Sequence, residues 1–247
     1  MKLHRISIVL ILVACALFAT DKTIRMGDHL MRRGDYADAY KEFSKALSAD
    51  PENPNILWRA GSALTHMALR EIGNIRHEHL EQATNYINRS IVLDSDILEA
   101  HLEYARALGY LALFKPDWDD FRVARRVREE LGIVLRNEPK NPDAHFLMGT
   151  WHRWVGPVPM ITRKPHDLGS ANVDSSLYYF RQAVSLDKDN LLYKLELGRT
   201  YAFLDADDKA RATFNEITDA KNVRTQFQHI VEQARTELAR LDGEFEE

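Results

Sequence analysis

The chain has 247 residues, of which 45% are hydrophobic and 28% charged, and this balance predicts one globular domain rather than a disordered or collagen-like chain. The net charge of -4 lacks the basic excess that binding to nucleic acid requires, so nucleic acid is excluded as a partner. Only 11 Gly and 8 Pro occur, and apolar residues recur at helical spacing through most of the chain. We therefore expect an all-α fold.

Residues 1–20 have the features of an export signal. Lys2 and Arg5 precede an apolar run, residues 6–14, which is shorter than the roughly 20 residues needed to span a bilayer. The run ends in Leu-Val-Ala-Cys, which resembles the bacterial lipobox and predicts lipidation of Cys15. Two alternatives stay open: simple secretion after cleavage behind Ala19, and an uncleaved membrane anchor.

Lipidation predicts that the chain is attached to a membrane of the cell envelope through its N-terminus and faces the periplasm. Ala16 stands where an Asp would retain a lipoprotein at the inner membrane, and this favours the outer membrane. Cys15 is the only cysteine of the chain, so no disulfide can form within it and the fold depends on packing.

Residues 34–51 resemble the second half of a tetratricopeptide repeat (TPR), a helix-turn-helix unit of about 34 residues. The pattern contains Ala39, Phe43, Ala46 and Pro51 in order, and it places Gly27 at the small position of the first helix. Small residues let two helices approach closely, an aromatic ring fills the seam, and a proline ends the second helix. One such pair cannot bury its apolar face alone, so further repeats are expected.

Weaker repeats follow, and they predict a TPR solenoid of about five helix pairs over residues 21–241. Each later first helix has one small residue at the close contact: Gly61, Ala105, Gly149 and Gly198. Each later second helix has one large apolar residue at the seam: Ile87, Leu131, Phe180 and Phe214. Residues 154–173 form a long insertion in the fourth repeat. Residues 223–241 are expected to form a capping helix, and residues 242–247 an acidic tail.

The stretch 141–204 resembles the regulator of microtubule dynamics family and its bacterial relatives. The resemblance rests on a short motif in a helix and on a hydrophobic insertion with a proline and a basic pair: Met148, Gly149, Trp151, Pro159, Arg163 and Lys164. It implies an extended TPR domain, often on a membrane anchor, with a cavity that takes up a lipid or a partner.

Motifs of enzymes are absent from the sequence, so no catalytic residue, cofactor or metal is expected. There is no Gly-rich phosphate loop, no G-x-S-x-G elbow and no H-E-x-x-H zinc motif. His77 and His79 come closest to a metal site, but side chains two residues apart on a helix diverge, and we expect a solvated loop there instead.

The first helices of TPR units line a concave groove, and their inward positions predict the ligand-binding residues. These are Trp58, His66, Leu102, Arg106, Tyr110, Phe146, Thr150, Arg153, Trp154, Arg199 and Phe203. Arginine forks bind carboxylates or phosphates and aromatic rings bury apolar groups, so the set suits an acidic peptide, a C-terminal carboxylate or a phospholipid. In the alternative, the aromatic residues fill a tight superhelix and the arginines pair with Asp and Glu.

The insertion 154–173 is too long for an ordinary connection, because structureless loops above about 12 to 15 residues are uncommon in compact domains. We expect it to form a lid over one mouth of the groove near Trp151 and Trp154, with Pro159 in its apolar half and with Arg163 and Lys164 facing an anion or a membrane surface. In the alternative, it patches a gap between repeats.

The sequence therefore predicts a membrane-tethered, non-enzymatic scaffold that binds a protein or peptide in its groove. The second hypothesis is a lipid-binding or lipid-carrying module that holds an anionic amphiphile in the groove. Under this hypothesis the partner is a phospholipid.

Overall fold

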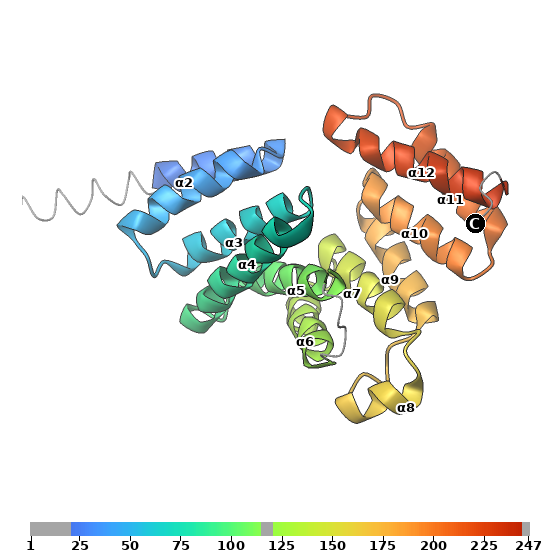
Figure 1. The fold of residues 1–247 in the computed structure, drawn as a ribbon, viewed down its shortest axis with the longest axis horizontal. Coiled ribbons are helices and arrows are strands. Elements are labelled where there is room, and N and C mark those ends of the chain that lie inside the picture. Colours follow the sequence, from blue (N-terminus) through green and yellow to red (C-terminus); the bar gives the residue numbers. More distant parts are fainter. Residues whose placement is uncertain (1–20, 115–120, 244–247) are drawn as a thin grey trace, which may run out of the picture. The chain divides into compact units, whose positions relative to one another are not determined.

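The computed structural model describes residues 21–114 and 121–243, and every regular element within these residues is a helix (Figure 1). Cys15 with the rest of the predicted export signal, and residues 244–247 of the predicted acidic tail, lie outside the described residues. The chain divides near residue 118 into two compact units, which we call unit 1 and unit 2 and describe separately.

Unit 1 is a series of antiparallel helix pairs in which each helix contacts the next one along the chain. It consists of a helix over residues 21–33, α2 (Tyr36–Ala49), α3 (Pro54–Ala68), α4 (Gly73–Leu93) and α5 (Leu98–Leu113). A core cluster of fully buried Phe43, Ile56 and Ala60, with smaller residues around them, joins the first pair to the second.

Unit 2 also consists of paired helices and has three short helices in addition (Figure 1). It consists of α6 (Phe121–Asn137), α7 (Pro142–Val155), α8 (Met160–Arg163), the 3-10 helix η1 (Lys164–His166), α9 (Val173–Leu186), α10 (Leu191–Phe203), α11 (Asp207–Thr218), the 3-10 helix η2 (Thr225–Phe227) and α12 (Gln228–Leu241). α7 packs on α9, α10 on α11, and α11 on α12.

Asparagines start four of these helices. The side chains of Asn53, Asn141, Asn172 and Asn190 each accept a hydrogen bond from a backbone N–H in the first turn of α3, α7, α9 and α10. Such caps satisfy donors that have no partner inside the helix. In α3 and α7 a proline follows the asparagine, and its fixed φ suits the first helical turn.

The predicted repeat register is confirmed at the close contacts between paired helices. A Cβ atom on Gly27 would lie 2.4 Å from the Phe43 ring, and one on Gly198 would lie 2.4 Å from the Phe214 ring. Gly149 faces the Phe180 ring in the same way, at 2.9 Å. Only a residue without a side chain lets the ring of the second helix lie against the first helix. The contacts confirm the all-α TPR fold class.

The third predicted repeat falls on the division of the chain, since α5 belongs to unit 1 and α6 to unit 2. The expected capping helix is shorter than predicted: α12 begins at Gln228, and its buried stripe consists of Ile230, Val231 and Ala234. Among the described helices none combines the length and the apolar character that crossing a membrane requires.

Candidate functional site

We call the side of each unit formed by the first helices of its repeats the first-helix surface, since the predicted groove residues lie on these helices. In unit 1, Glu103 of α5 accepts hydrogen bonds from the Ser62 hydroxyl of α3 (2.9 Å) and from Arg106 Nε (3.1 Å). All three residues are buried, as is Leu102. The prediction that Leu102 and Arg106 line a ligand groove is therefore wrong, because both side chains are buried.

The remaining predicted residues of unit 1 contact other side chains of the same unit. His66 stacks on the Tyr36 ring with centroids 4.8 Å apart, and Tyr110 stacks on the Phe114 ring. The guanidinium of Arg59 lies 4.3 Å from the centre of the Trp58 ring. Trp58 Nε1 is buried and has no hydrogen-bond acceptor among the described residues. Unit 1 thus offers partly covered aromatic rings but no free arginine at the predicted positions.

In unit 2, two predicted residues serve the packing of the repeats. Phe146 is only 4% exposed, and its ring stacks on Tyr193 of the next repeat at 4.9 Å. Thr150 donates its hydroxyl hydrogen to the Phe146 carbonyl. The predicted ligand contact of Phe146 is wrong, because its ring fills the seam between α7 and α10.

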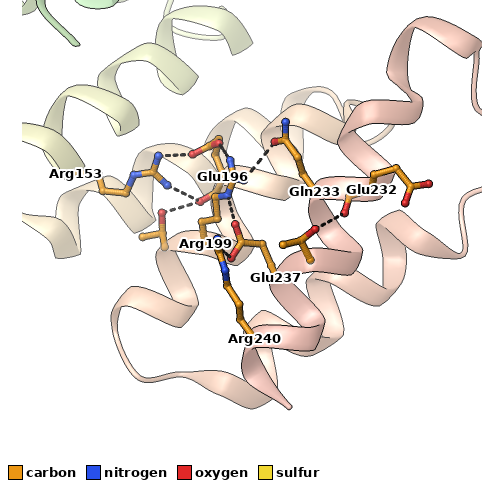
Figure 2. Close-up of polar contacts among 9 residues, drawn as sticks. Arg153, Glu196, Arg199, Glu232, Gln233, Glu237 and Arg240 are labelled. Atoms are coloured by element: carbon orange, nitrogen blue, oxygen red, sulfur yellow. Dashed lines mark hydrogen bonds and ion pairs between the residues drawn. The ribbon is translucent and has the colours of Figure 1, made fainter. Parts of the chain in front are cut away.

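Arg153 and Arg199 belong to a charged network that joins α7, α10 and α12 (Figure 2). Arg153 donates to the carboxylate and the backbone carbonyl of Glu196. Arg199 donates to Glu196 at 2.8 Å and to Glu237 at 2.7 Å, and its third nitrogen lies 3.3 Å from the side-chain oxygen of Gln233. One carboxylate, that of Glu196, therefore links arginines of two successive repeats.

The network agrees with the second expectation from the sequence, in which the arginines on the first helices pair with acidic residues instead of binding a ligand. Burial alone would lower the pKa of Arg199, but the carboxylates of Glu196 and Glu237 outweigh it and raise that pKa above its ordinary value. Arg240 also contacts Glu237, at 3.2 Å. The network has a net charge of +1, because it contains three arginines (Arg153, Arg199 and Arg240) and two glutamates (Glu196 and Glu237).

Sequence reasoning missed Glu196, Gln233 and Glu237. Glu196 could have been found, because Glu and Arg three residues apart on a helix are neighbours on its surface. The contribution of α12 could not, since no local spacing relates Glu237 to Arg199, which are 38 positions apart.

Trp154 and Phe203 are the predicted groove residues of unit 2 that stay open to solvent, at 51% and 57% exposure. Trp154 follows Arg153 directly near the end of α7, and Phe203 lies one helical turn after Arg199 at the end of α10. Large aromatic side chains beside ordered arginines are typical of the residues that dominate protein interfaces.

The insertion is folded around Arg163, which is 6% exposed. Its guanidinium donates to the backbone carbonyls of Val158 (2.8 Å), Leu168 (3.0 Å) and Gly169 (3.2 Å), and also to that of Ala171. The prediction that Arg163 faces an anion or a membrane is wrong, because turns of the insertion leave carbonyls that the guanidinium satisfies. Pro159 and Lys164 are exposed, so Pro159 does not pack near Trp151 and Trp154 as the lid hypothesis expects of the apolar half.

The insertion is also fixed to the helices of unit 2. Arg128 of α6 donates to the backbone carbonyl and the carboxylate of Asp167, and the Phe121 ring stacks on His166 at 4.5 Å. On α7, His152 Nδ1 accepts a hydrogen bond from the backbone N–H of Asn172 (3.3 Å). These contacts are those of a structural patch.

Burial and, to a smaller extent, the charges of Arg128 and Arg163 together lower the pKa of His152 to about 4. His152 is therefore neutral at pH 7, as its acceptor role toward Asn172 requires.

A shallow hollow of about 320 Å³ lies between α9, α10 and α11, and the sequence did not predict it. Val184 and Leu197 form its apolar wall, and Arg181, Lys188 and Lys194 surround it. Lys194 pairs with Glu216 at 2.8 Å. The predicted binding residues all lie on first helices, whereas this hollow is also lined by α9 and α11, which are second helices.

The two closely spaced histidines lie on α4 and not in the expected loop. His77 contacts Glu81 at 3.0 Å, whereas His79 contacts Glu71 at 2.6 Å, so the rings diverge. Within residues 21–114 and 121–243, no group of three His, Cys, Asp or Glu residues is arranged to hold a metal ion.

The family model described as Regulator of microtubule dynamics protein 1-3 matches residues 23–242. Comparison with curated proteins gives no match. Solved structures show the same fold at low identity. A thermophilic TPR protein of Thermus thermophilus is 16% identical with a TM-score of 0.67, and the match covers 88% of this chain and all of that one.

Two further structures are similar at the level of the fold. MamA of Desulfovibrio magneticus is 15% identical with a TM-score of 0.50, over 89% of this chain and 97% of that one. Human IFIT1, solved as a dimer with PPP-AAAA, is 17% identical with a TM-score of 0.56, over 91% of this chain and 55% of that one.

Proposed function

Because the chain belongs to the regulator of microtubule dynamics family and has the TPR fold, we propose that it is a non-enzymatic scaffold, tethered to a membrane, that binds a partner protein on the first-helix surface of unit 2. Repeat proteins of this kind use such extended surfaces for binding. The observation that supports the choice of unit 2 is the exposure of Trp154 and Phe203 on α7 and α10, the helices that also carry Arg153, Glu196 and Arg199 of the network.

The network supports binding because it is held in place before a partner arrives. Arg199 has three partners within 3.3 Å, and Arg153 is tied to the same Glu196. Side chains that are already ordered lose little conformational entropy on association. Trp154 and Phe203 then supply apolar area at low entropic cost, since an aromatic side chain has two rotatable bonds.

The net charge of +1 on the network favours a partner segment with apolar side chains and a mild excess of acidic groups. It is weaker support for a phospholipid headgroup, because Glu196 and Glu237 already occupy the arginines that would bind the phosphate. A peptide segment on this surface is therefore the better supported proposal.

The tether is proposed at the N-terminus, from the signal-like residues 1–20 and the lipobox-like sequence that ends at Cys15. A three-chain lipid would hold the chain firmly, where one acyl chain would not. With this attachment, we infer that the scaffold lies in the cell envelope, with its TPR units outside the lipid. Labelled fatty acid that enters the wild-type chain but not Cys15→Ala would support this attachment; absence of label in both would overturn it.

Site-specific photo-crosslinking tests the binding surface. A photoreactive phenylalanine derivative at position 203 should form adducts with a polypeptide in intact cells. The matched control is position 178 on α9, because Tyr178 is 56% exposed and Phe203 is 57% exposed. Equal adducts at both positions would overturn the proposed surface. An adduct of phospholipid mass at position 203 would instead support the lipid-binding alternative.

A further inference from the structure

The insertion places an apolar tip away from the helices that carry it. Figure 1 shows α8 at the far end of the insertion from α7 and α9. Ile161 on α8 is 84% exposed and Met160 is 51% exposed, so two large apolar side chains lie in water next to one another. Exposed apolar side chains scattered singly are ordinary, but an adjacent pair on a projecting segment calls for an explanation.

The tip is held rigidly. Four carbonyls from both limbs of the insertion converge on Arg163, and Leu168 and Ala171 are buried beneath it. Arg128 fixes Asp167 to α6. A segment that merely filled a gap between repeats would have no need to hold Ile161 out into solvent, so these contacts position the tip as well as closing the loop.

The charge around the tip is positive. The Lys164 side chain is exposed and makes no ion pair or hydrogen bond within the described parts of the chain. The acidic group nearest in sequence, Asp167, is neutralised by Arg128. A free cation beside apolar side chains is the arrangement found in segments that lie in the interface of an anionic membrane.

From these features we propose that the tip of the insertion, Met160 and Ile161 with Lys164, inserts into the surface of the membrane that carries the tether. The inference rests on the proposed membrane attachment. A protein interface of ordinary size buries about 800 Å² on each partner, which is far more than two side chains provide. Two side chains can, however, orient a chain that is already anchored, because insertion to a depth of about 5 to 10 Å is enough to bury them.

This contact would fix the orientation of unit 2 on the membrane. The two attachments, the N-terminus and the tip, belong to different units of the chain. The firm tether strengthens the weak contact of the tip, because it raises the effective concentration of the tip at the membrane.

Quenching of tryptophan by brominated lipid tests the proposal. The full chain with Ile161→Trp is reconstituted into vesicles of phosphatidylcholine brominated in its acyl chains and phosphatidylglycerol, and the wild-type signal is subtracted. The control is Ile72→Trp, because Ile72 is 82% exposed and lies in unit 1. We expect at least about twofold stronger quenching of the tryptophan at position 161, because quenching requires the side chain to reach acyl-chain depth.

Equal quenching at the two positions, with chain that floats together with the vesicles, would overturn the tip contact and leave the tether in place. Chain that neither floats with the vesicles nor shows quenching would overturn both. The contribution of Lys164 is tested by Lys164→Glu in the Ile161→Trp background, which should reduce the quenching in anionic vesicles. If Lys164→Glu leaves the quenching unchanged, the electrostatic part of the proposal is wrong.

Discussion

The chain contains the same local motif twice, and its two copies have different environments. On α5, Glu103 and Arg106 enclose Ala105, and on α10, Glu196 and Arg199 enclose Gly198. In the first copy the side chains of Arg106 and Glu103 are 9% and 10% exposed. In the second, the Arg199 side chain is 31% exposed and its partner Glu196 is 11% exposed.

The difference comes from the neighbours of each helix. In the first copy, Ser62 of the preceding repeat also donates to Glu103, and all three side chains are buried. The second copy is extended by Arg153 from α7 and by Glu237 from α12, so that it becomes a network at the surface (Figure 2). The same pair of residues three positions apart thus becomes part of the core or of the surface according to the adjoining helices.

The largest effect is expected where the motif is buried. Glu103→Gln removes a buried carboxylate that accepts from both Ser62 and Arg106, and loss of one member of a buried charged pair costs about 3 to 5 kcal/mol. Glu196→Gln should cost about 1 to 2 kcal/mol, because Arg199 keeps Glu237 and has access to water. Urea unfolding of the two variants measures both values. Equal losses would contradict the contrast between the two copies.

His152 is a buried base without a counter-charge, so the stability contributed by its site should depend on pH. The pKa of His152 falls from 6.5 to about 4 on folding, so below pH 6.5 the unfolded chain binds a proton that the folded chain does not. Stability should therefore be complete above pH 6.5 and decline as the pH falls toward 4, by roughly 2 to 3 kcal/mol for this group. The difference in unfolding free energy between wild type and His152→Gln, followed from pH 7.5 to about pH 4, isolates the effect. A difference that does not change with pH would show that His152 is not the group responsible.

We expect that the space at Gly198, the small residue of the second copy, is too small for a larger side chain. A Cβ on Gly198 would lie 2.4 Å from the Phe214 ring, and such overpacking costs about 1 to 3 kcal/mol. Gly109→Ala on α5 is the matched control, because a Cβ there meets no atom within 4 Å. The control should be neutral or stabilising by up to about 1 kcal/mol, since alanine favours the helix. Thermal unfolding of the two variants decides whether crowding or helix propensity dominates at position 198.

The smallest effect is expected at the rim of the network. Arg240 contacts Glu237 at 3.2 Å, but its side chain is 62% exposed. Exposed ion pairs contribute between about 0 and 1 kcal/mol, so Arg240→Ala should change the unfolding free energy by less than about 0.5 kcal/mol. A loss as large as that of Glu196→Gln would mean that Arg240 belongs to the ordered part of the network.

Local periodicity determined the fold class and the register of the repeats. Small residues and aromatic rings at fixed spacing, such as Gly27 with Phe43 and Gly198 with Phe214, identified the helix pairs, and the structure places them in contact. The asparagines that cap α3 and α7 follow from local chemistry in the same way. These features depend on residues within one repeat, and a sequence displays them directly.

The tertiary structure alone decided which polar groups became buried and which stayed open. Arg163 appeared from the sequence to be a surface cation, but the turns of its own insertion supplied four carbonyl acceptors. Arg199 was predicted to bind an anionic ligand, but it binds the carboxylate of Glu237, which α12 brings next to it. A charged side chain in a crowded site binds the nearest available counter-group, and contacts from distant segments do not follow from local spacing.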